Sequence, residues 1–144
     1  MIFSRACEYG IRSVLYLAIN PKSGPVLVRD IAGALKLPFP FLAKIIRTLT
    51  LQGLVHSVKG PGGGVTLAKP AEEMTLLQVV EAIDGLDLTK VCVMGISDCS
   101  EEHACPLHEQ WGAARKQIVV MLENQSVAEI TEQMKAKNYL LVLP

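Results

Sequence analysis

The sequence predicts a mainly α-helical chain with one small β-hairpin and a long C-terminal helix. Three observations predict this fold class. Apolar residues recur at helical spacing in segments separated by proline and glycine breaks. Two short β-favouring runs flank a glycine cluster at residues 60–64. With 144 residues, half of them hydrophobic, the chain is long enough to bury a core, and no apolar run approaches transmembrane length.

Three helices are expected before the hairpin. The first spans residues 4–18, with Ser4 as its N-cap, and a proline-rich and glycine-containing break follows at 20–25. A short helix is expected at 29–35. The third runs from Pro38, in its first turn, to about residue 52, where Gly53 ends it. The apolar positions predicted to face inward on the first and third helices are Cys7, Ile11, Val14, Leu15, Ala18, Phe41, Leu42, Ile45, Ile46 and Leu49.

The hairpin comprises strands at 54–59 and 65–68, and a helix at 74–84 follows, capped by Thr75 and closed by Gly85. Two helices joined by a tight turn and followed by a hairpin have the order of a winged helix-turn-helix. The glycine-rich tip is not a phosphate-binding P-loop, because it leads into a strand and lacks the G-K-[ST] that opens a helix there.

In such a fold the second helix of the pair enters the major groove of DNA. Lys44 and Arg47 lie three residues apart on its outward face, and Lys59 stands at the base of the wing. The predicted DNA-contacting set is Arg5, Arg29, Pro40, Phe41, Lys44, Arg47, Lys59, Gly62 and Gly63.

The charge distribution supports a nucleic-acid partner although the formal net charge is zero. Residues 1–70 carry nine basic side chains against two acidic ones, a formal charge of +7. Residues 71–144 carry five basic side chains against twelve acidic ones, a formal charge of −7. The first half can attract phosphate, and the second half repels it.

Cys92, Cys99 and Cys105, with His108, form a second candidate site. Three thiols and an imidazole within seventeen residues match the donors that a tetrahedral zinc or an iron–sulfur cluster requires. No C-x-x-C pair is present, which argues against a zinc ribbon. A disulfide with a spare thiol is disfavoured because the chain shows no secretory leader, so the expected setting is the cytoplasm. Thiol redox sensing remains as an alternative.

Pro106 is expected to begin the next helix, with Cys105 at its N-cap and His108 at its third position. Both residues would then reach one metal, and the helix dipole would favour the thiolate. Glu8 and Arg12 have the spacing of a helical ion pair, and His103 and His56 are weaker candidates for the fourth ligand.

A heptad-spaced apolar seam follows on that helix, and we expect it to form a twofold homodimer interface. Packing within one subunit is the alternative. A short helix at 126–134 and an apolar tail at 138–144 end the chain. The seam residues are Leu107, Trp111, Ala114, Ile118 and Met121.

The run LAKIIRTLTLQGLVHSVKGPGGGVTLAKP, followed by the three cysteines, resembles the Rrf2 family of bacterial winged-helix regulators, from Phe3 to about Leu122. The resemblance implies a homodimeric repressor or dual regulator, with an iron–sulfur cluster on the three cysteines. A 2Fe–2S cluster is favoured, and 4Fe–4S is the alternative. In IscR-like members a histidine at the place of His108 is the fourth ligand, whereas NsrR-like members use a carboxylate at the place of Glu8 in the partner subunit. Ala43 replaces a glutamate of IscR-like members, so the operator sequence does not transfer.

The combined interpretation has three regions: a DNA-binding region at 1–70, a linker helix and cysteine loop at 71–105, and a dimerisation helix and tail at 106–144. The expected function is operator binding controlled by the state of the cluster. The main alternative is a thiol-redox or zinc-stabilised regulator or interaction protein without a cluster. No catalytic constellation is visible, so an enzyme is not expected.

Overall fold

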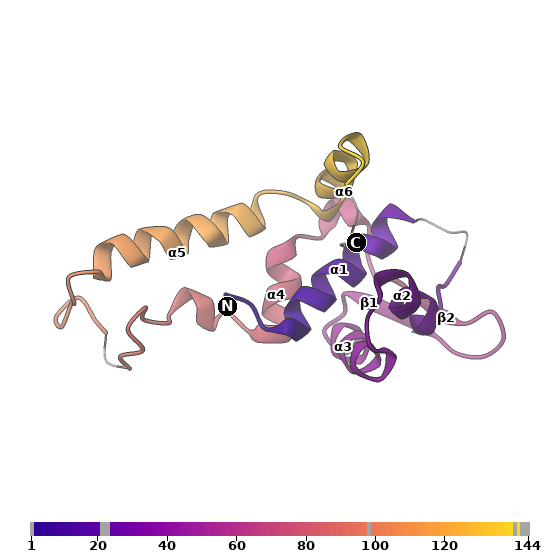
Figure 1. The fold of residues 1–144 in the computed structure, drawn as a ribbon, viewed down its shortest axis with the longest axis horizontal. Helices are drawn as coiled ribbons and strands as arrows, with labels where there is room; N and C mark the ends of the chain where they lie inside the picture. The colour runs from indigo at the N-terminus through magenta and orange to yellow at the C-terminus, as the bar shows by residue number, and fades with distance from the viewer. Residues whose placement is uncertain (1, 21–23, 98, 140, 142–144) are drawn as a thin grey trace.

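The structure is a computed structural model that describes residues 2–20, 24–97, 99–139 and 141. A body of helices with a small β-hairpin carries an extended arm (Figure 1). The body contains α1 (Arg5–Ile19), α2 (Val28–Leu35), α3 (Phe39–Leu51), the strands β1 (Val55–Val58) and β2 (Gly64–Leu67), the short 3-10 helix η1 (Ala71–Glu73), α4 (Leu76–Asp84) and α6 (Val127–Ala136). The arm consists of α5 (His108–Glu123) and the segment 85–107, which includes the 3-10 helix η2 (Asp87–Thr89). The predicted fold class is therefore confirmed.

Helix boundaries follow local capping chemistry. The Ser4 hydroxyl accepts a hydrogen bond from the Cys7 N–H at 3.0 Å, as predicted for the N-cap of α1. Thr75 and Ser126 cap α4 and α6, each in a reciprocal capping box with the side chain three residues later. The third helix begins at Phe39, so Pro38 is its N-cap residue and does not lie in its first turn.

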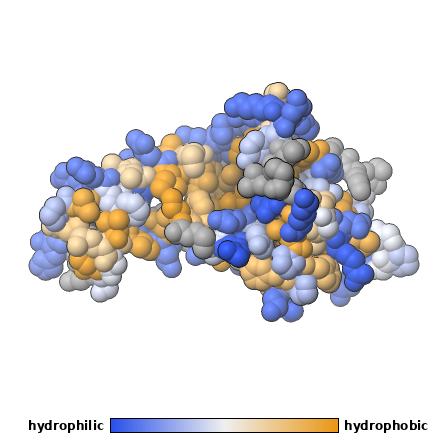
Figure 2. All heavy atoms as spheres, viewed as in Figure 1, coloured by the Kyte–Doolittle hydropathy of each residue, from blue (hydrophilic) through white to orange (hydrophobic). Residues whose placement is uncertain are grey.

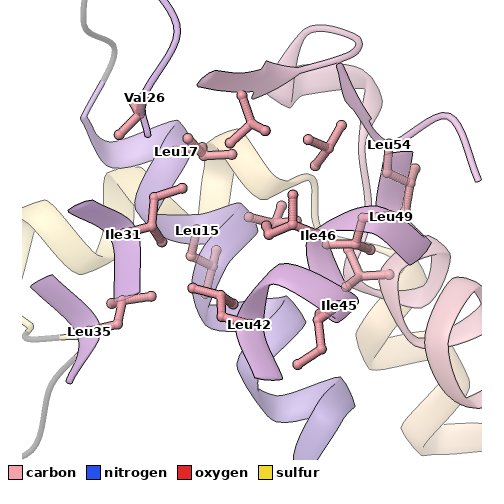
Figure 3. Packing of buried hydrophobic residues seen from close by; sticks show 14 of the residues in the cluster. Leu15, Leu17, Val26, Ile31, Leu35, Leu42, Ile45, Ile46, Leu49 and Leu54 are labelled. Carbon is pink, nitrogen blue, oxygen red and sulfur yellow. The ribbon is translucent and has the colours of Figure 1, made fainter. Parts of the chain in front are cut away.

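The main core lies where α1, α2 and α3 meet under the hairpin (Figure 3). Leu42, Ile45, Ile46 and Leu49 point inward from α3, as the helical spacing predicted. Phe41 is an exception: its ring is 39% exposed and packs edge-on against Tyr9, with ring centroids 5.7 Å apart. The prediction that Phe41 is buried is wrong, because this position turns past the core toward the side of α1.

The wing is a two-stranded antiparallel hairpin in which Val55 pairs with Leu67 and Val58 with Gly64. Val26 extends it with one further bridge, through hydrogen bonds of 3.0 and 2.8 Å to Val65. Position 64 requires glycine, because its φ is +143° and a Cβ there would collide with the backbone of Val26. The hairpin is thereby joined to the segment that enters α2.

A smaller core joins the arm to the body. Cys7 of α1, Val80 of α4 and Leu122 of α5 are all buried in it, and Ile118 packs against them. Leu122 is the one buried residue of α5, so the helix is attached near its C-terminal end and its N-terminal end projects outward (Figure 1). Within the described residues, no helix is both long and apolar enough to cross a membrane.

Candidate DNA interface and cysteine pocket

The outward face of α3 is basic and accessible. Lys44 and Arg47 are both exposed, and the turn of residues 36–38 between α2 and α3 presents this helix at the surface. The one ion pair among the described residues joins Lys135 to Glu132 on α6, so these two cations have no carboxylate partner in that part of the chain. They are free to meet phosphate or base edges.

The remaining predicted DNA contacts surround α3. Arg5, Arg29, Pro40 and Lys59 are exposed. Gly62 is exposed at the wing tip with φ +72°, a conformation that glycine adopts without strain. Gly63 is buried, because a Cβ there would collide with the carbonyl of Val58 in the wing itself. The requirement for glycine at position 63 therefore comes from the turn rather than from access to DNA.

The cysteine loop gathers all the predicted donors around one small cavity. Cys92, Cys99, Cys105 and His108 line a space of about 20 Å³ between the loop and the first turn of α5. Cys92 is buried, and the other two thiols are half-buried. Cys99 Sγ lies 3.1 Å from His108 Nδ1, which is hydrogen-bonding distance for a sulfur. Residues that are up to sixteen positions apart in sequence thus share one pocket.

The helix that supplies His108 begins later than predicted. His108 is the first residue of α5, and Leu107 occupies the N-cap position without a side-chain cap. Cys105 lies in the preceding turn, where its carbonyl accepts from the His108 N–H at 3.0 Å. The prediction that Cys105 is the N-cap is therefore wrong, because a separate turn at Pro106 and Leu107 comes before the helix. That turn still brings Cys105 and His108 to the same cavity.

The environment of the thiols separates their acidities. Backbone N–H groups of Ile96 and Met94 lower the pKa of Cys92, and the Met94 nitrogen lies 3.4 Å from its Sγ. Burial raises the pKa of Cys99, and the neighbouring Cys92 thiol raises it further. Of these two thiols, Cys92 therefore loses its proton first.

Two further residues of α5 line the pocket, and one of them, Arg115, was not predicted from the sequence. Trp111 and Arg115 line it, and both donate hydrogen bonds to the Val91 carbonyl, at 2.7 and 3.1 Å. Arg115 also counteracts the raised pKa of Cys99. The sequence signal for this contact is its position, seven residues after His108 on the same helix face.

The predicted homodimer seam divides into two faces in the structure. Trp111 and Ile118 are half-buried against their own chain, whereas Leu107 is 45% and Met121 61% exposed. Ala114 is also exposed. The indole N–H of Trp111 donates to the carbonyl of Val91, so the loop of its own chain covers part of this side chain.

The donor set fits an iron–sulfur cluster in kind and number: three thiols and an imidazole on one cavity. The cavity itself is about the size of a water molecule, so the loop must move outward to admit such a group. Within the described ranges, no three His, Cys, Asp or Glu side chains converge as a single metal ion would require. Glu8 does not line this cavity; it is exposed on α1.

The fold and its basic helix define a DNA-binding transcriptional regulator of the winged helix-turn-helix class. A family model described as "Rrf2: Iron-dependent Transcriptional regulator" matches residues 3–133, and the chain belongs to this family. A helix-turn-helix-type regulator of Aquifex aeolicus is 33% identical over 132 residues, covering 90% of this chain and 91% of that protein. The transcriptional regulator IscR of Cronobacter sakazakii is 31% identical over 124 residues, covering 85% and 75% of the two chains. These relatives are regulators, and the chain is not an enzyme.

Solved structures show the same fold. CymR of B. subtilis, described as the global cysteine regulator, superposes with a TM-score of 0.79 at 22% identity, covering 91% of this chain and 96% of that one. IscR of T. potens superposes with a TM-score of 0.77 at 23% identity, covering 93% and 88%. The oxidised form of Staphylococcus aureus CymR gives a TM-score of 0.70 at 25% identity, covering 92% and 97%.

Proposed function

We propose that this regulator is a homodimeric repressor whose operator binding is controlled by an iron–sulfur cluster, with Cys92, Cys99, Cys105 and His108 as its ligands. A 2Fe–2S cluster is favoured, with 4Fe–4S as the alternative. The observation that carries the proposal is the shared cavity: all three thiols and His108 line it, although the loop between them is irregular. The site of action is the cytoplasm, where the operator DNA lies.

When bound, the cluster supplies a redox-active and removable group that ties four side chains of the arm together. The chain's own residues carry the consequence to the body. Trp111 and Arg115 bond the loop to α5 at Val91, so a displaced loop shifts the N-terminal end of that helix. Leu122 at the other end of α5 packs on Cys7 and Val80, which connect to α1 and α4. α1 in turn packs directly on α3.

The arm carries exposed apolar surface that a second copy of the chain would cover. Figure 2 shows apolar surface over the arm and where the arm joins the body. An apolar groove of about 500 Å³ between the end of α4 and the arm includes Ile2, Phe3 and Leu88. Burying these side chains against a twofold-related arm gives an isologous dimer, which suits a twofold-symmetric operator. The exposed apolar residues of the arm are Leu86, Val91, Val93, Met94, Ile96, Leu107, Val120 and Met121.

The test is purification without oxygen, followed by measurement of visible absorbance, iron and acid-labile sulfide. Serine replacements at Cys92, Cys99 and Cys105, made one at a time, should each abolish the absorbance and the bound iron. Cys7→Ala is the matched control, because Cys7 is buried in the small core and does not line the cavity. Full iron content in all three serine variants would overturn the proposed ligand set.

A regulator that uses the thiols themselves, or zinc, is the second candidate. The observation that favours it is the reactive pairing within the pocket: the pKa of Cys92 is lowered, and Cys99 Sγ lies 3.1 Å from His108 Nδ1. A colourless anaerobic protein with one zinc per chain, or with no metal and oxidant-dependent DNA binding, would establish it. Stoichiometric iron and sulfide would exclude it.

A further inference from the structure

An apolar notch lies between the N-terminal ends of α2 and α3 and the wing. Leu27, Phe39 and Val58 form its exposed walls, with exposed fractions of 55%, 39% and 39%. The hollow between them measures about 390 Å³, and its lining is completed by Val28, Arg29, Ser57, Gly64 and Val65. Three separate elements therefore each contribute a large apolar side chain to one surface hollow. We call this hollow the notch.

The notch residues are not used for helix capping. Leu27 occupies the N-cap position of α2 and makes no side-chain cap, although serine or aspartate would stabilise the helix there. Phe39 is the first residue of α3, which also lacks a side-chain cap. Apolar side chains at exposed helix N-termini gain little for folding, so their gathering around one hollow indicates a contact made with a partner.

The charges around the notch identify that partner. The Arg29 guanidinium carbon lies over the Phe39 ring, 5.2 Å from its centroid. A cation therefore packs on one face of this ring at the edge of the notch. Phe39 shares a row of α3 with Ala43 and the exposed Arg47, at spacings of four residues. An apolar surface within a basic one matches duplex DNA, whose major groove displays one apolar group, the C5-methyl of thymine.

We infer that the notch recognises a thymine methyl in each half-site of the operator, with Phe39 as the contacting side chain. The inference rests on the proposed operator binding and adds a determinant of its sequence. The N-terminal end of a recognition helix approaches base edges first, and the wing lies across the adjacent backbone. A methyl group that enters the space between them contacts the apolar side chains of Leu27, Phe39 and Val58.

The experiment uses the full-length protein and duplexes that it selects from a random-sequence DNA library. Each selected duplex is prepared with thymine and again with uracil, which removes only the C5-methyl groups. The wild type should bind the uracil duplex roughly three- to tenfold more weakly per half-site, with the loss assigned to one thymine by single replacements. Phe39→Ala should bind both duplexes equally, and Phe39→Leu should keep most of the difference.

Leu51→Ala is the matched control, because Leu51 is an exposed apolar residue at the opposite end of α3. It should preserve the full difference between thymine and uracil. Equal binding of both duplexes by the wild type, or an undiminished difference in Phe39→Ala, would overturn the inference while leaving operator binding intact. Failure to select any duplex would instead overturn the proposed operator binding itself.

Discussion

Asp84, the last residue of α4, accepts a hydrogen bond of 2.8 Å from the backbone N–H of Ser4, the N-cap of α1. The Ser4 hydroxyl donates a second bond to the same carboxylate. These bonds join residues that are 80 positions apart in sequence. Gly85 follows immediately and begins the segment that leads to the cysteines. The start of the DNA-binding body is therefore bonded to the root of the arm.

Replacing Asp84 by alanine should lower the free energy of unfolding by about 1–3 kcal/mol, because two donors of Ser4 lose a charged acceptor. Glu81→Ala is the control, since Glu81 is an exposed acidic residue one turn earlier on α4. Urea denaturation measures both variants. Equal stability of the two variants would mean that the Ser4–Asp84 bonds contribute nothing to the attachment of the arm.

The stability of the fold should depend on pH through the ionisation of the Cys7 thiol. Burial, reinforced by the Asp84 carboxylate, raises the pKa of Cys7 to about 12 from an ordinary value of 9.0. The neutral thiol therefore stabilises the fold fully below pH 9, and this contribution is lost as the pH rises from 9 toward 12. The loss amounts to about 1.4 kcal/mol per pH unit in that window.

Cys7→Ala removes this titration. Between pH 8 and about 10.5, the stability advantage of the wild type over the variant should shrink by about 2 kcal/mol. Urea denaturation at several pH values gives the difference directly, and it cancels the titration of the lysines and tyrosines that both proteins share. A constant difference across this range would contradict the raised pKa.

The regular elements were predictable because their signals are local. Capping side chains such as Ser4, Thr75 and Ser126, together with the apolar spacing, identify the helices from the sequence alone. The cysteine site was predictable because its donors lie in one short segment. In both cases the residues that interact are also neighbours in the chain.

Long-range contacts explain what the sequence did not predict. Arg12 donates to the carbonyls of Leu35 and Leu141 rather than to Glu8, the partner that its spacing favoured. Trp111 turns toward its own chain because the carbonyl of Val91, in an irregular segment, accepts from the indole. Periodicity describes a helix face but not which irregular backbone atom will reach it.

The two candidate fourth ligands can be separated by single replacements. His108→Ala should shift or weaken the visible spectrum of the anaerobic protein, because His108 Nδ1 already lies 3.1 Å from the Cys99 sulfur. Glu8→Ala should leave the spectrum unchanged. The opposite pattern would assign the fourth ligand to a carboxylate of the partner subunit.

DNA binding by the body should depend on the exposed cations. Alanine at Lys44, Arg47 or Lys59 should weaken binding and reduce the salt dependence of the affinity, with the slope falling by about 1 for each DNA phosphate that the variant no longer neutralises. Lys135→Ala on α6 is the control, since this lysine pairs with Glu132. An unchanged salt slope in all three variants would place the DNA on another surface.

Met121 offers the sharpest test of the dimer, because it is 61% exposed on the arm and its replacement leaves the chain's own core intact. Met121→Asp should yield a monomer, since an interface that buries the side chain would leave the aspartate charge unpaired. A monomer contacts one half-site and loses the binding energy of the other, so operator affinity should fall by at least about 100-fold with the recognition helix unchanged.

Gln133→Asp on the exposed face of α6 is the control. Sedimentation at micromolar concentration measures both, and a Met121→Asp variant that remains dimeric would remove this face of α5 from the interface.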